Sequence, residues 1–324
     1  LLEDGLLIAA AEEERFSRKK HDFGFPHQAI DYCLKEAGIS GRDLDYVVFY
    51  EKPLLKFERI LLSGLQTFPK SNAVIRESMI AWFNEKLWVK GQILTELNIP
   101  DEKLLFVEHH LSHAASAFFC APFEEAAILT VDGVGEWTTA TMGKGTACWE
   151  QLPDGRPGAM SSNDIALFSE TRFPHSLGLL YSAFTAFLGF RVNNGEYKVM
   201  GMTPYGRPNR MEDVYKLIEV GDDGGYRLNM EYFSFHHSTK RTFNNNFVKL
   251  FGEPRVHESV FYTPTTHPDK DHPDWDEATA QVNQHYADIA ASVQRVTEET
   301  ILTMVNHAHQ TTGLKNLCMA GGVA

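Results

Sequence analysis

The sequence predicts an α/β protein built of two lobes. The first 50 residues have the pattern of two strands around a turn, then a helix, then a strand. A second hairpin pattern begins near residue 126, and a long amphipathic pattern precedes a last strand. Because each half opens with a hairpin, we expect one lobe over residues 1–122 and a second over residues 123–324.

The first lobe is expected to begin with a strand that leaves a tight turn. Asp4–Gly5 is a strong hairpin signal, and the apolar run "GLLIAAA" follows it. We expect the partner strand to lie upstream of Leu1. Apolar residues at helical spacing between Pro26 and the stop signal Gly38 predict a helix, and "LDYVVFYEK" then predicts a buried strand.

A helical insertion is predicted over residues 54–98, since aromatic and aliphatic residues recur there at spacings of three and four. The segment "KLLFVEH" then predicts a strand, and "HLSHAASAFFCAPF" predicts a helix that ends near Pro122. The insertion therefore lies between two sheet elements of the first lobe.

The second lobe is expected to open with two strands joined through Gly133–Gly135. A helix is predicted over residues 174–190, followed by an ordered loop in "RVNNGEYKVMGMTPYGRP". Residues 221–275 have no clear periodicity, so no element is predicted there. A stripe of apolar residues predicts a long helix over residues 277–312, stopped by Gly313 and followed by the strand "LKNLCMA".

Composition excludes several classes of protein. The net charge is -13 and the sequence pI is about 5.5, so we expect no nucleic-acid partner and no anionic membrane surface. No apolar run approaches the roughly 20 residues that a membrane span requires. The four cysteines are scattered without a CxxC pair, which suits a cytoplasmic protein. The chain starts in a turn and stops just after a strand, so we expect a fragment truncated at both ends.

Three histidines lie within five positions in the segment "VEHHLSHAAS". On a helix, His109 and His113 are four residues apart and face the same way, as two imidazoles that bind one metal ion do. Asp132, at the end of a predicted strand, is a natural oxygen ligand for the same ion. The segment lacks the glutamate of HExxH, which argues against a zinc protease. The alternative is a solvated or core-packed histidine pair.

Three further segments contain residues that suit a ligand. The run "EEERFSRKKHD" is either a solvated charged loop or a site for an anionic ligand at a sheet edge. In "NNGEYKVMGMTPYG", the glycines allow close approach to phosphates, Lys198 supplies charge and Glu196 can hold Mg²⁺ through water. The glycines Gly321 and Gly322 are either a second place of nucleotide contact or a simple turn.

Six segments resemble consecutive motifs of the O-carbamoyltransferases, the group that contains the nodulation-factor, cephamycin and tobramycin carbamoyltransferases. The match runs from the first residues to the last and leaves out the helical insertion and residues 221–275. The segments are "DGLLIAAAEEERFSRKKHDFGFP", "VEHHLSHAASAFF", "ILTVDGVGEWTTATMGKG", "HSLGLLYSAFTAFLGF", "NNGEYKVMGMTPYG" and "MAGGVA".

The resemblance implies a fold of the actin, hexokinase and heat-shock-chaperone ATPase superclass, in which two ribonuclease-H-like lobes bind nucleotide between them. It also implies kinship with the tRNA threonylcarbamoyl transferases, where a similar V-x-H-x-x-x-H segment holds an iron or zinc ion. In this sequence that segment contains Val107, His109 and His113.

The resemblance also implies roles for single residues. His109, His113 and Asp132 would be ligands of a divalent metal, with Fe²⁺ as the first expectation and Zn²⁺ or Mn²⁺ as alternatives. A further aspartate ligand is expected beyond Ala324, and a catalytic histidine before Leu1.

Other matched residues concern the nucleotide. Lys20 matches a family residue that contacts the phosphate or carbamoyl end of the intermediate, which is a catalytic and a binding role. Glu196, Lys198, Gly321 and Gly322 match segments that line the nucleotide cleft. ATP and Mg²⁺ are therefore the expected cofactors besides the divalent metal.

The resemblance implies a reaction in two halves. A C-terminal YrdC-like domain, absent from this chain, uses ATP and carbamoyl phosphate to make carbamoyl-adenylate. The two-lobed domain then moves the carbamoyl group to a hydroxyl of a small-molecule acceptor, so we expect this chain alone to be inactive. His110 is a candidate base, and its alternative is an exposed or structurally hydrogen-bonded ring. Two other hypotheses stay open: tRNA threonylcarbamoyl transfer, and a non-catalytic nucleotide-binding module of the same fold.

Overall fold

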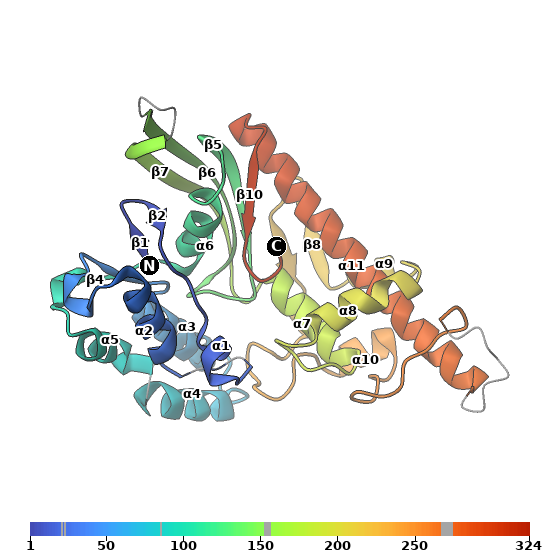
Figure 1. The fold of residues 1–324 in the computed structure, drawn as a ribbon. Helices are drawn as coiled ribbons and strands as arrows, with labels where there is room; N and C mark the ends of the chain where they lie inside the picture. The colour runs from blue at the N-terminus through green and yellow to red at the C-terminus, as the bar shows by residue number, and fades with distance from the viewer. Residues whose placement is uncertain (21, 23, 85, 152–156, 267–274) are drawn as a thin grey trace.

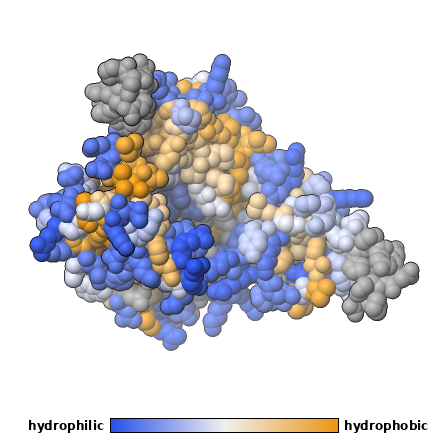
Figure 2. All heavy atoms as spheres, viewed as in Figure 1, coloured by the Kyte–Doolittle hydropathy of each residue, from blue (hydrophilic) through white to orange (hydrophobic). Residues whose placement is uncertain are grey.

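The computed structural model describes residues 1–20, 22, 24–84, 86–151, 157–266 and 275–324. Figure 1 shows the N-terminal helices on one side of a central sheet and a C-terminal group of helices along the long α11 (Glu277–Thr312) on the other. Figure 2 shows that the surface is hollowed between these two groups. No helix within the described ranges is both long and apolar enough to cross a membrane.

The N-terminal hairpin is shorter than predicted. Strands β1 (Leu2–Glu3) and β2 (Leu6–Leu7) pair antiparallel, so the partner strand lies within the chain and the prediction of an upstream partner is wrong. The acidic residues that follow form helix α1 (Glu13–Ser17) instead of a continued strand, because alanine and glutamate favour helix. The Glu13 carboxylate accepts a hydrogen bond from the backbone N–H of Ala29 at 2.9 Å, which ties α1 to the next helix.

The next helix and strand follow the prediction. Helix α2 (His27–Ala37) ends at Gly38, whose φ of 68° is left-handed and whose N–H bonds the carbonyl of Leu34. The 3₁₀ helix η1 (Gly41–Asp43) leads to strand β3 (Val47–Phe49). β3 pairs in parallel with β4 (Leu104–Phe106), which lies beyond the insertion.

Helices fill the insertion between β3 and β4, as predicted for residues 54–98. They are α3 (Pro53–Gln66), α4 (Asn72–Asn84), η2 (Lys86–Trp88) and α5 (Val89–Leu97), with η3 (Asp101–Lys103) just before β4. Ile93 and Leu97 are buried with Leu104, so the insertion is anchored on the small parallel sheet.

A four-stranded sheet with the order β10-β5-β6-β7 forms the centre of the molecule. Its strands are β5 (Glu125–Val131), β6 (Thr138–Gln151), β7 (Pro157–Arg172) and β10 (Leu317–Ala320). β5 and β6 are antiparallel, which confirms the second hairpin, whereas β10 pairs with β5 in parallel. Alternate residues of β5 point to opposite faces. Ile128 therefore packs with Phe118 of α6 (His109–Phe118), and Leu129 packs with the C-terminal group.

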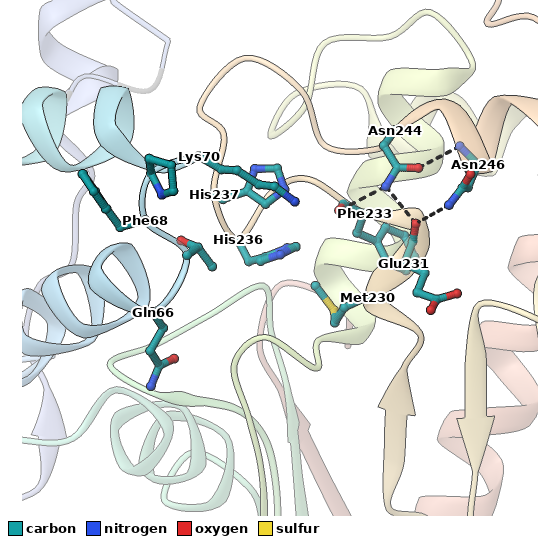
Figure 3. Close-up of a pocket in the computed structure, with 12 residues that line it drawn as sticks. Gln66, Phe68, Lys70, Met230, Glu231, Phe233, His236, His237, Asn244 and Asn246 are labelled. Atoms are coloured by element: carbon teal, nitrogen blue, oxygen red, sulfur yellow. Dashed lines mark hydrogen bonds between the residues drawn. The ribbon is translucent and has the colours of Figure 1, made fainter.

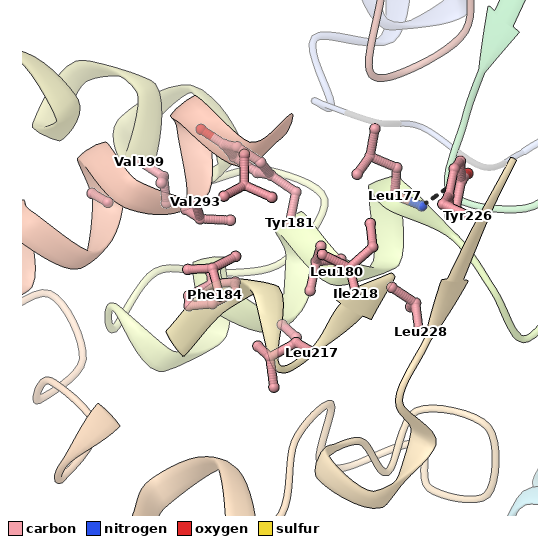
Figure 4. Close-up of a cluster of buried hydrophobic side chains, with 14 of the residues drawn as sticks. Leu177, Leu180, Tyr181, Phe184, Val199, Leu217, Ile218, Tyr226, Leu228 and Val293 are labelled. Carbon is pink, nitrogen blue, oxygen red and sulfur yellow. Dashed lines mark hydrogen bonds between the residues drawn. The ribbon is translucent and has the colours of Figure 1, made fainter. Parts of the chain in front are cut away.

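The C-terminal group covers the second face of the sheet with one apolar core. Leu180 and Phe184 of α7 (Leu177–Phe187) lie in this core (Figure 4). Val293 of α11 and Leu217, which precedes β8, lie in the same core. The other elements are α8 (Glu196–Met202), η4 (Thr203–Tyr205), α9 (Met211–Tyr215), β8 (Ile218–Val220), β9 (Tyr226–Leu228), η5 (Met230–Tyr232) and α10 (Asn245–Phe251).

Two sequence predictions differ from the observed fold, and one region without a prediction contains regular elements. Helix α8 occupies part of the segment predicted as a loop, and α6 ends at Phe118 rather than near Pro122. Residues 221–275, of which 267–274 lie outside the described residues, contain β9, η5 and α10. The α/β class is confirmed, and the two ribonuclease-H-like lobes over residues 1–122 and 123–324 stay a prediction.

Candidate metal centre

His109, His113 and Asp132 come together where α6 begins and β5 ends. The Nε2 atom of His109 lies 2.9 Å from Oδ2 of Asp132, and the Nε2 atom of His113 lies 3.5 Å from the same oxygen. The two imidazole rings are nearly perpendicular, at 89°, with centroids 4.6 Å apart. One ligand atom from each of the three residues lies within 4.8 Å of the others, the geometry of a group that can share one ion.

Two helices and a glycine-rich turn fix this arrangement. A Cβ on Gly135 would lie 2.9 Å from the Cβ of His109, so only glycine lets the turn after β5 pass this close to α6. On the other side, Ser176 caps α7 and its hydroxyl donates to the carbonyl of Gly133 at 2.6 Å. The turn that carries Asp132 is therefore held between the first turns of α6 and α7.

The Asp132 carboxylate is strongly stabilised as an anion. Burial alone would raise its pKa, but the neighbouring His109 and His113 rings and the backbone N–H of Gly133 together lower the pKa well below its usual range. A partly buried negative charge between two imidazoles strongly attracts a cation.

The donor set fits a divalent transition metal. The Nε2 atom of His113 is buried and has no hydrogen-bond partner, as a nitrogen reserved for an ion would be. Two imidazole nitrogens and one carboxylate oxygen suit iron, zinc or manganese. His109, His113 and Asp132 are thus the residues that would hold such an ion in this chain.

The His110 ring lies beside the triad, with its centroid 5.8 Å from that of His109 and 5.9 Å from that of His113, and its Nδ1 faces the sheet. Its side chain is buried, with Nδ1 at 2.6 Å from the hydroxyl of Thr130, which in turn lies 2.6 Å from the hydroxyl of Thr141. Burial, followed by the charge on His109, lowers the pKa of His110 to about 4, so the ring is neutral at neutral pH. This geometry matches the alternative of a structurally hydrogen-bonded ring. The role of His110 as a base stays a prediction.

Gly321 and Gly322 lie beside the triad, because the parallel strands β5 and β10 end at the same edge of the sheet. The N–H of Gly322 donates to Oδ1 of Asp132 at 3.3 Å. Gly321 has a φ of 106°, and a Cβ there would lie 2.2 Å from the carbonyl oxygen of Val131. Both positions therefore support the Asp132 turn through close backbone approach.

Lys20 contacts the segment that carries Glu196, through Asn194 and Tyr197. The ammonium of Lys20 donates to Oδ1 of Asn194 at 2.7 Å and lies 5.9 Å from the centroid of the Tyr197 ring. The Glu196 carboxylate accepts hydrogen bonds from the backbone of Asn193 and the hydroxyl of Ser182, both at 3.0 Å. The structure thus joins the "SRKK" and "NNGEYK" segments, which are far apart in the sequence.

Lys198 does not share these hydrogen bonds. Its ammonium forms an ion pair with Glu258 at 2.8 Å and lies over the Phe190 ring at 5.6 Å. The hydrogen bond to Glu258 raises the pKa of Lys198. The ammonium of Lys198 is therefore already paired with a carboxylate of the same chain.

Sequence reasoning missed Glu136, which is 6% exposed and lies next to the triad. Its carboxylate accepts hydrogen bonds from the backbone N–H groups of Lys52 at 2.7 Å and His109 at 3.1 Å. A second acid, four residues after Asp132 in the short glycine-rich turn "DGVGEW", was the available signal. Its partners come from two other segments, which no local pattern identifies.

Arg59 of the insertion was also missed. The residue is 7% exposed, and its guanidinium lies 5.1 Å from the centroid of the Phe173 ring. Burial lowers the pKa of Arg59 to about 10, while the negative charges of Glu51 and Glu136 act in the opposite direction. Arg59 therefore connects the helical insertion electrostatically to the turn that supports His109.

The fold and this site define an α/β protein with a His-His-Asp candidate metal centre at the ends of parallel strands. The whole chain, residues 1–324, matches the family model described as Carbamoyltransferase N-terminus. The chain therefore belongs to this carbamoyltransferase family, and the predicted resemblance is confirmed.

Similar proteins span more than this chain. An uncharacterized protein of Synechocystis sp. is 45% identical over 332 residues, covering 100% of this chain and 48% of the relative. The nodulation protein NolNO of Sinorhizobium fredii is 31% identical over 330 residues, covering 100% of this chain and 40% of the relative. The nodulation protein NolO of Bradyrhizobium diazoefficiens is 28% identical over 219 residues, covering 67% of this chain and 31% of the relative. The chain thus spans about half or less of the length of these relatives.

Proposed function

We propose that the protein containing this chain is an ATP-dependent O-carbamoyltransferase and that the chain forms its transfer domain. The observation that carries the proposal is the His109, His113 and Asp132 triad, found in a chain that matches the carbamoyltransferase family from end to end. The proposed acceptor is a hydroxyl of a small molecule.

In the proposed transfer, the acceptor oxygen attacks the carbonyl carbon of carbamoyl-adenylate. The new C–O bond forms while the bond from that carbon to the phosphate oxygen breaks, AMP leaves with the electron pair, and the hydroxyl proton passes to a base. A divalent metal bound at the triad, Fe²⁺ first and Zn²⁺ or Mn²⁺ otherwise, would supply Lewis-acid polarisation of the carbonyl. The anionic Asp132 and the imidazoles of His109 and His113 would hold that charge in place.

The proposal includes a fold of the actin and hexokinase ATPase superclass, with nucleotide between two ribonuclease-H-like lobes. Lys20 and Glu196 would contact the phosphate side of the nucleotide with Mg²⁺, and Gly321 and Gly322 would let it approach the strand ends. Support comes from the hydrogen bond of Lys20 to Asn194, which brings a cation to the segment of Glu196. Carbamoyl phosphate and ATP would react first on a YrdC-like domain elsewhere in the protein.

The test uses the full-length protein with ATP, carbamoyl phosphate, Fe²⁺ and a panel of hydroxylated acceptors. We expect carbamoylated product and AMP from the wild type. His109→Ala should lose bound metal and product, because it removes one of three ligands. His27→Ala is the matched control, since its side chain is 54% exposed on α2. Nucleotide binding without any carbamoyl transfer would instead favour the non-catalytic module.

A further inference from the structure

The side of α6 that packs on the central sheet carries a histidine among apolar residues. The buried residues of this helix are His110, Ala114 and Phe118, which lie on one side because residues four apart stand one above the other. Phe118 and Ala114 are buried with Ile128 of β5. Thr130, two residues further along β5 and on the same face of the strand, meets His110 instead. A polar contact therefore takes one place in an otherwise apolar interface.

His110 contacts the sheet through two buried hydroxyls. Its Nδ1 atom lies 2.6 Å from the hydroxyl of Thr130, which lies 2.6 Å from the hydroxyl of Thr141. All three side chains are buried, and the two threonines are directly opposite each other in the antiparallel pair of β5 and β6. Breaking a buried hydrogen bond is costly because the groups left behind have no water to bind. The ring is therefore fixed to both strands.

This contact bears on the candidate metal centre because its ligands come from two elements. His109 and His113 belong to α6, whereas Asp132 directly follows β5. The distances of 2.9 and 3.5 Å from their Nε2 atoms to Oδ2 of Asp132 therefore depend on how α6 sits on β5. Apolar packing is non-directional and tolerates small shifts of the helix. A hydrogen bond is confined to a narrow range of distance and angle, so the contact of His110 with Thr130 sets that position more strictly.

His110 supports the centre without belonging to its ligand set. The group whose ligand atoms lie close enough together to share one ion contains His109, His113 and Asp132 but not His110. The His110 ring lies next to both histidine ligands, yet its Nδ1 is bonded to the sheet. Its observed partner is thus a part of the scaffold.

We propose that His110 is a positioning residue, whose hydrogen bond to Thr130 fixes α6 on β5 and so sets the distance between the two imidazole ligands and the Asp132 carboxylate. The inference rests on the metal centre of the proposed function, but it does not depend on which group is transferred. It makes metal affinity and metal geometry depend on a bond that touches no ligand. The hypothesis of His110 as a base instead makes turnover alone depend on this ring.

The experiment measures metal affinity and geometry on the full-length protein without nucleotide or acceptor. Calorimetric titration with Zn²⁺ gives the affinity, with His109→Ala as the background from other sites, and the visible absorption of bound Co²⁺ reports the ligand geometry. Thr130→Val keeps the shape of the side chain and loses the hydroxyl, while His110→Leu loses the ring. We expect each change to lower Zn²⁺ affinity about tenfold, the lower end of the usual effect of a supporting contact, and to alter the Co²⁺ spectrum.

Two further variants separate positioning from a general loss of stability. Thr130→Ser keeps the hydroxyl, so it should retain most of the wild-type affinity and spectrum. The double variant Thr130→Val with His110→Leu should bind Zn²⁺ about as weakly as either single variant, because both changes remove the same bond. Losses of affinity that simply add, or a loss in Thr130→Ser as large as in Thr130→Val, contradict the positioning role.

Two buried groups elsewhere provide matched controls. The buried hydroxyl of Thr300 on α11 donates to the carbonyl of Val296 at 2.8 Å, so Thr300→Val makes the same chemical change as Thr130→Val. His236 lines a pocket of about 730 Å³ between the helical insertion and the segment after β9 (Figure 3). Its Nδ1, like Nε2 of His110, is buried without a hydrogen-bond partner among the described residues. Thr300→Val and His236→Leu should leave Zn²⁺ affinity and the Co²⁺ spectrum unchanged.

Turnover in the carbamoylation assay distinguishes the two roles of His110. His110→Asn keeps a hydrogen-bonding group near the place of Nδ1 but has no imidazole to act as a base. We expect it to retain most of the metal affinity and most of the turnover. Wild-type metal affinity and spectrum with turnover lost would make His110 a base and overturn the inference.

The remaining outcomes separate the inference from the proposed function. Unchanged Zn²⁺ affinity and Co²⁺ spectrum in both Thr130→Val and His110→Leu overturn the positioning role and leave the proposed function standing. The expected pattern of metal binding without any carbamoylation by the wild type defeats the proposed function and leaves the positioning role standing. A wild type that binds neither ion overturns the metal centre and the inference together.

Discussion

The carboxylate of Glu136 accepts a hydrogen bond from the backbone N–H of His109, the first residue of α6, at 3.1 Å. The same carboxylate accepts from the backbone N–H of Lys52, which precedes α3, at 2.7 Å. One buried negative charge therefore satisfies unpaired N–H groups at the starts of two helices, where it also meets the positive ends of their dipoles. The Glu136 side chain therefore holds both α6, which carries His109 and His113, and the helical insertion.

Glu136→Gln is expected to weaken metal binding. The amide keeps the size of the side chain but loses its charge, so the first turn of α6 and the His109 ring are held less firmly. Loss of such a supporting contact typically reduces metal affinity by about 10- to 100-fold. Calorimetric titration with Zn²⁺ or Mn²⁺ measures this, with Glu125→Gln as the control because its side chain is 55% exposed on β5. Unchanged affinity in Glu136→Gln would show that His109 does not depend on this contact.

Arg59→Met is expected to destabilise the fold strongly. The guanidinium is buried near Glu51 and Glu136, and its removal leaves their negative charges without this compensation. Removing one partner of a buried set of interacting charges lowers the free energy of unfolding by about 3 to 5 kcal/mol. Urea denaturation measures the free energy of unfolding.

Arg295→Met is the matched control for this change. Arg295 is 52% exposed and pairs with Glu299 within α11, so its loss should change stability by less than about 1 kcal/mol. In the double variant Arg59→Met with Glu136→Gln, the loss of stability should be smaller than the sum of the two single losses, because the charges of Arg59 and Glu136 interact. Strict additivity would contradict the electrostatic connection.

The sequence could predict the parts of the fold that depend on local patterns. The run that forms β5, the turn after it and the stop at Gly38 all have short-range signals, and each lies where expected. The triad was predictable for the same reason, since His109 and His113 are one helical turn apart and Asp132 follows a strand.

Long-range contacts decide the parts that could not be predicted. Phe247 and Phe251 make α10 part of the core only because they pack against Phe184 of α7, with ring centroids 5.0 and 5.1 Å away. Glu136 and Arg59 carry no periodic signal, since their neighbours come from other segments of the chain. Tertiary packing overrides local preference at such places.

Metal should stabilise the folded chain. An ion that binds the folded but not the unfolded state adds about 2.7 kcal/mol at a free concentration of 100 times its Kd. We therefore expect Zn²⁺, Mn²⁺ or anaerobic Fe²⁺ to raise the Tm of the wild type, and a chelator to reverse the shift. Asp132→Asn should lose most of this shift, because the anion between the imidazoles is gone. An equal shift in Asp132→Asn would place the ion elsewhere.

Stability should fall below about pH 6.5, with His236 responsible for part of the loss. Its folded pKa of about 4 lies below the unfolded value of about 6.5. Between these values the unfolded state binds more protons than the folded state, so the free energy of unfolding rises with pH. The positive charges of Lys70 and His237 add to burial in keeping the ring neutral. His236→Gln removes this titration, so its free energy of unfolding, measured in urea from pH 4.5 to 7, should depend less steeply on pH than that of His257→Gln. Equal slopes in the two variants would mean that His236 takes up its proton as readily in the folded protein as in the unfolded chain.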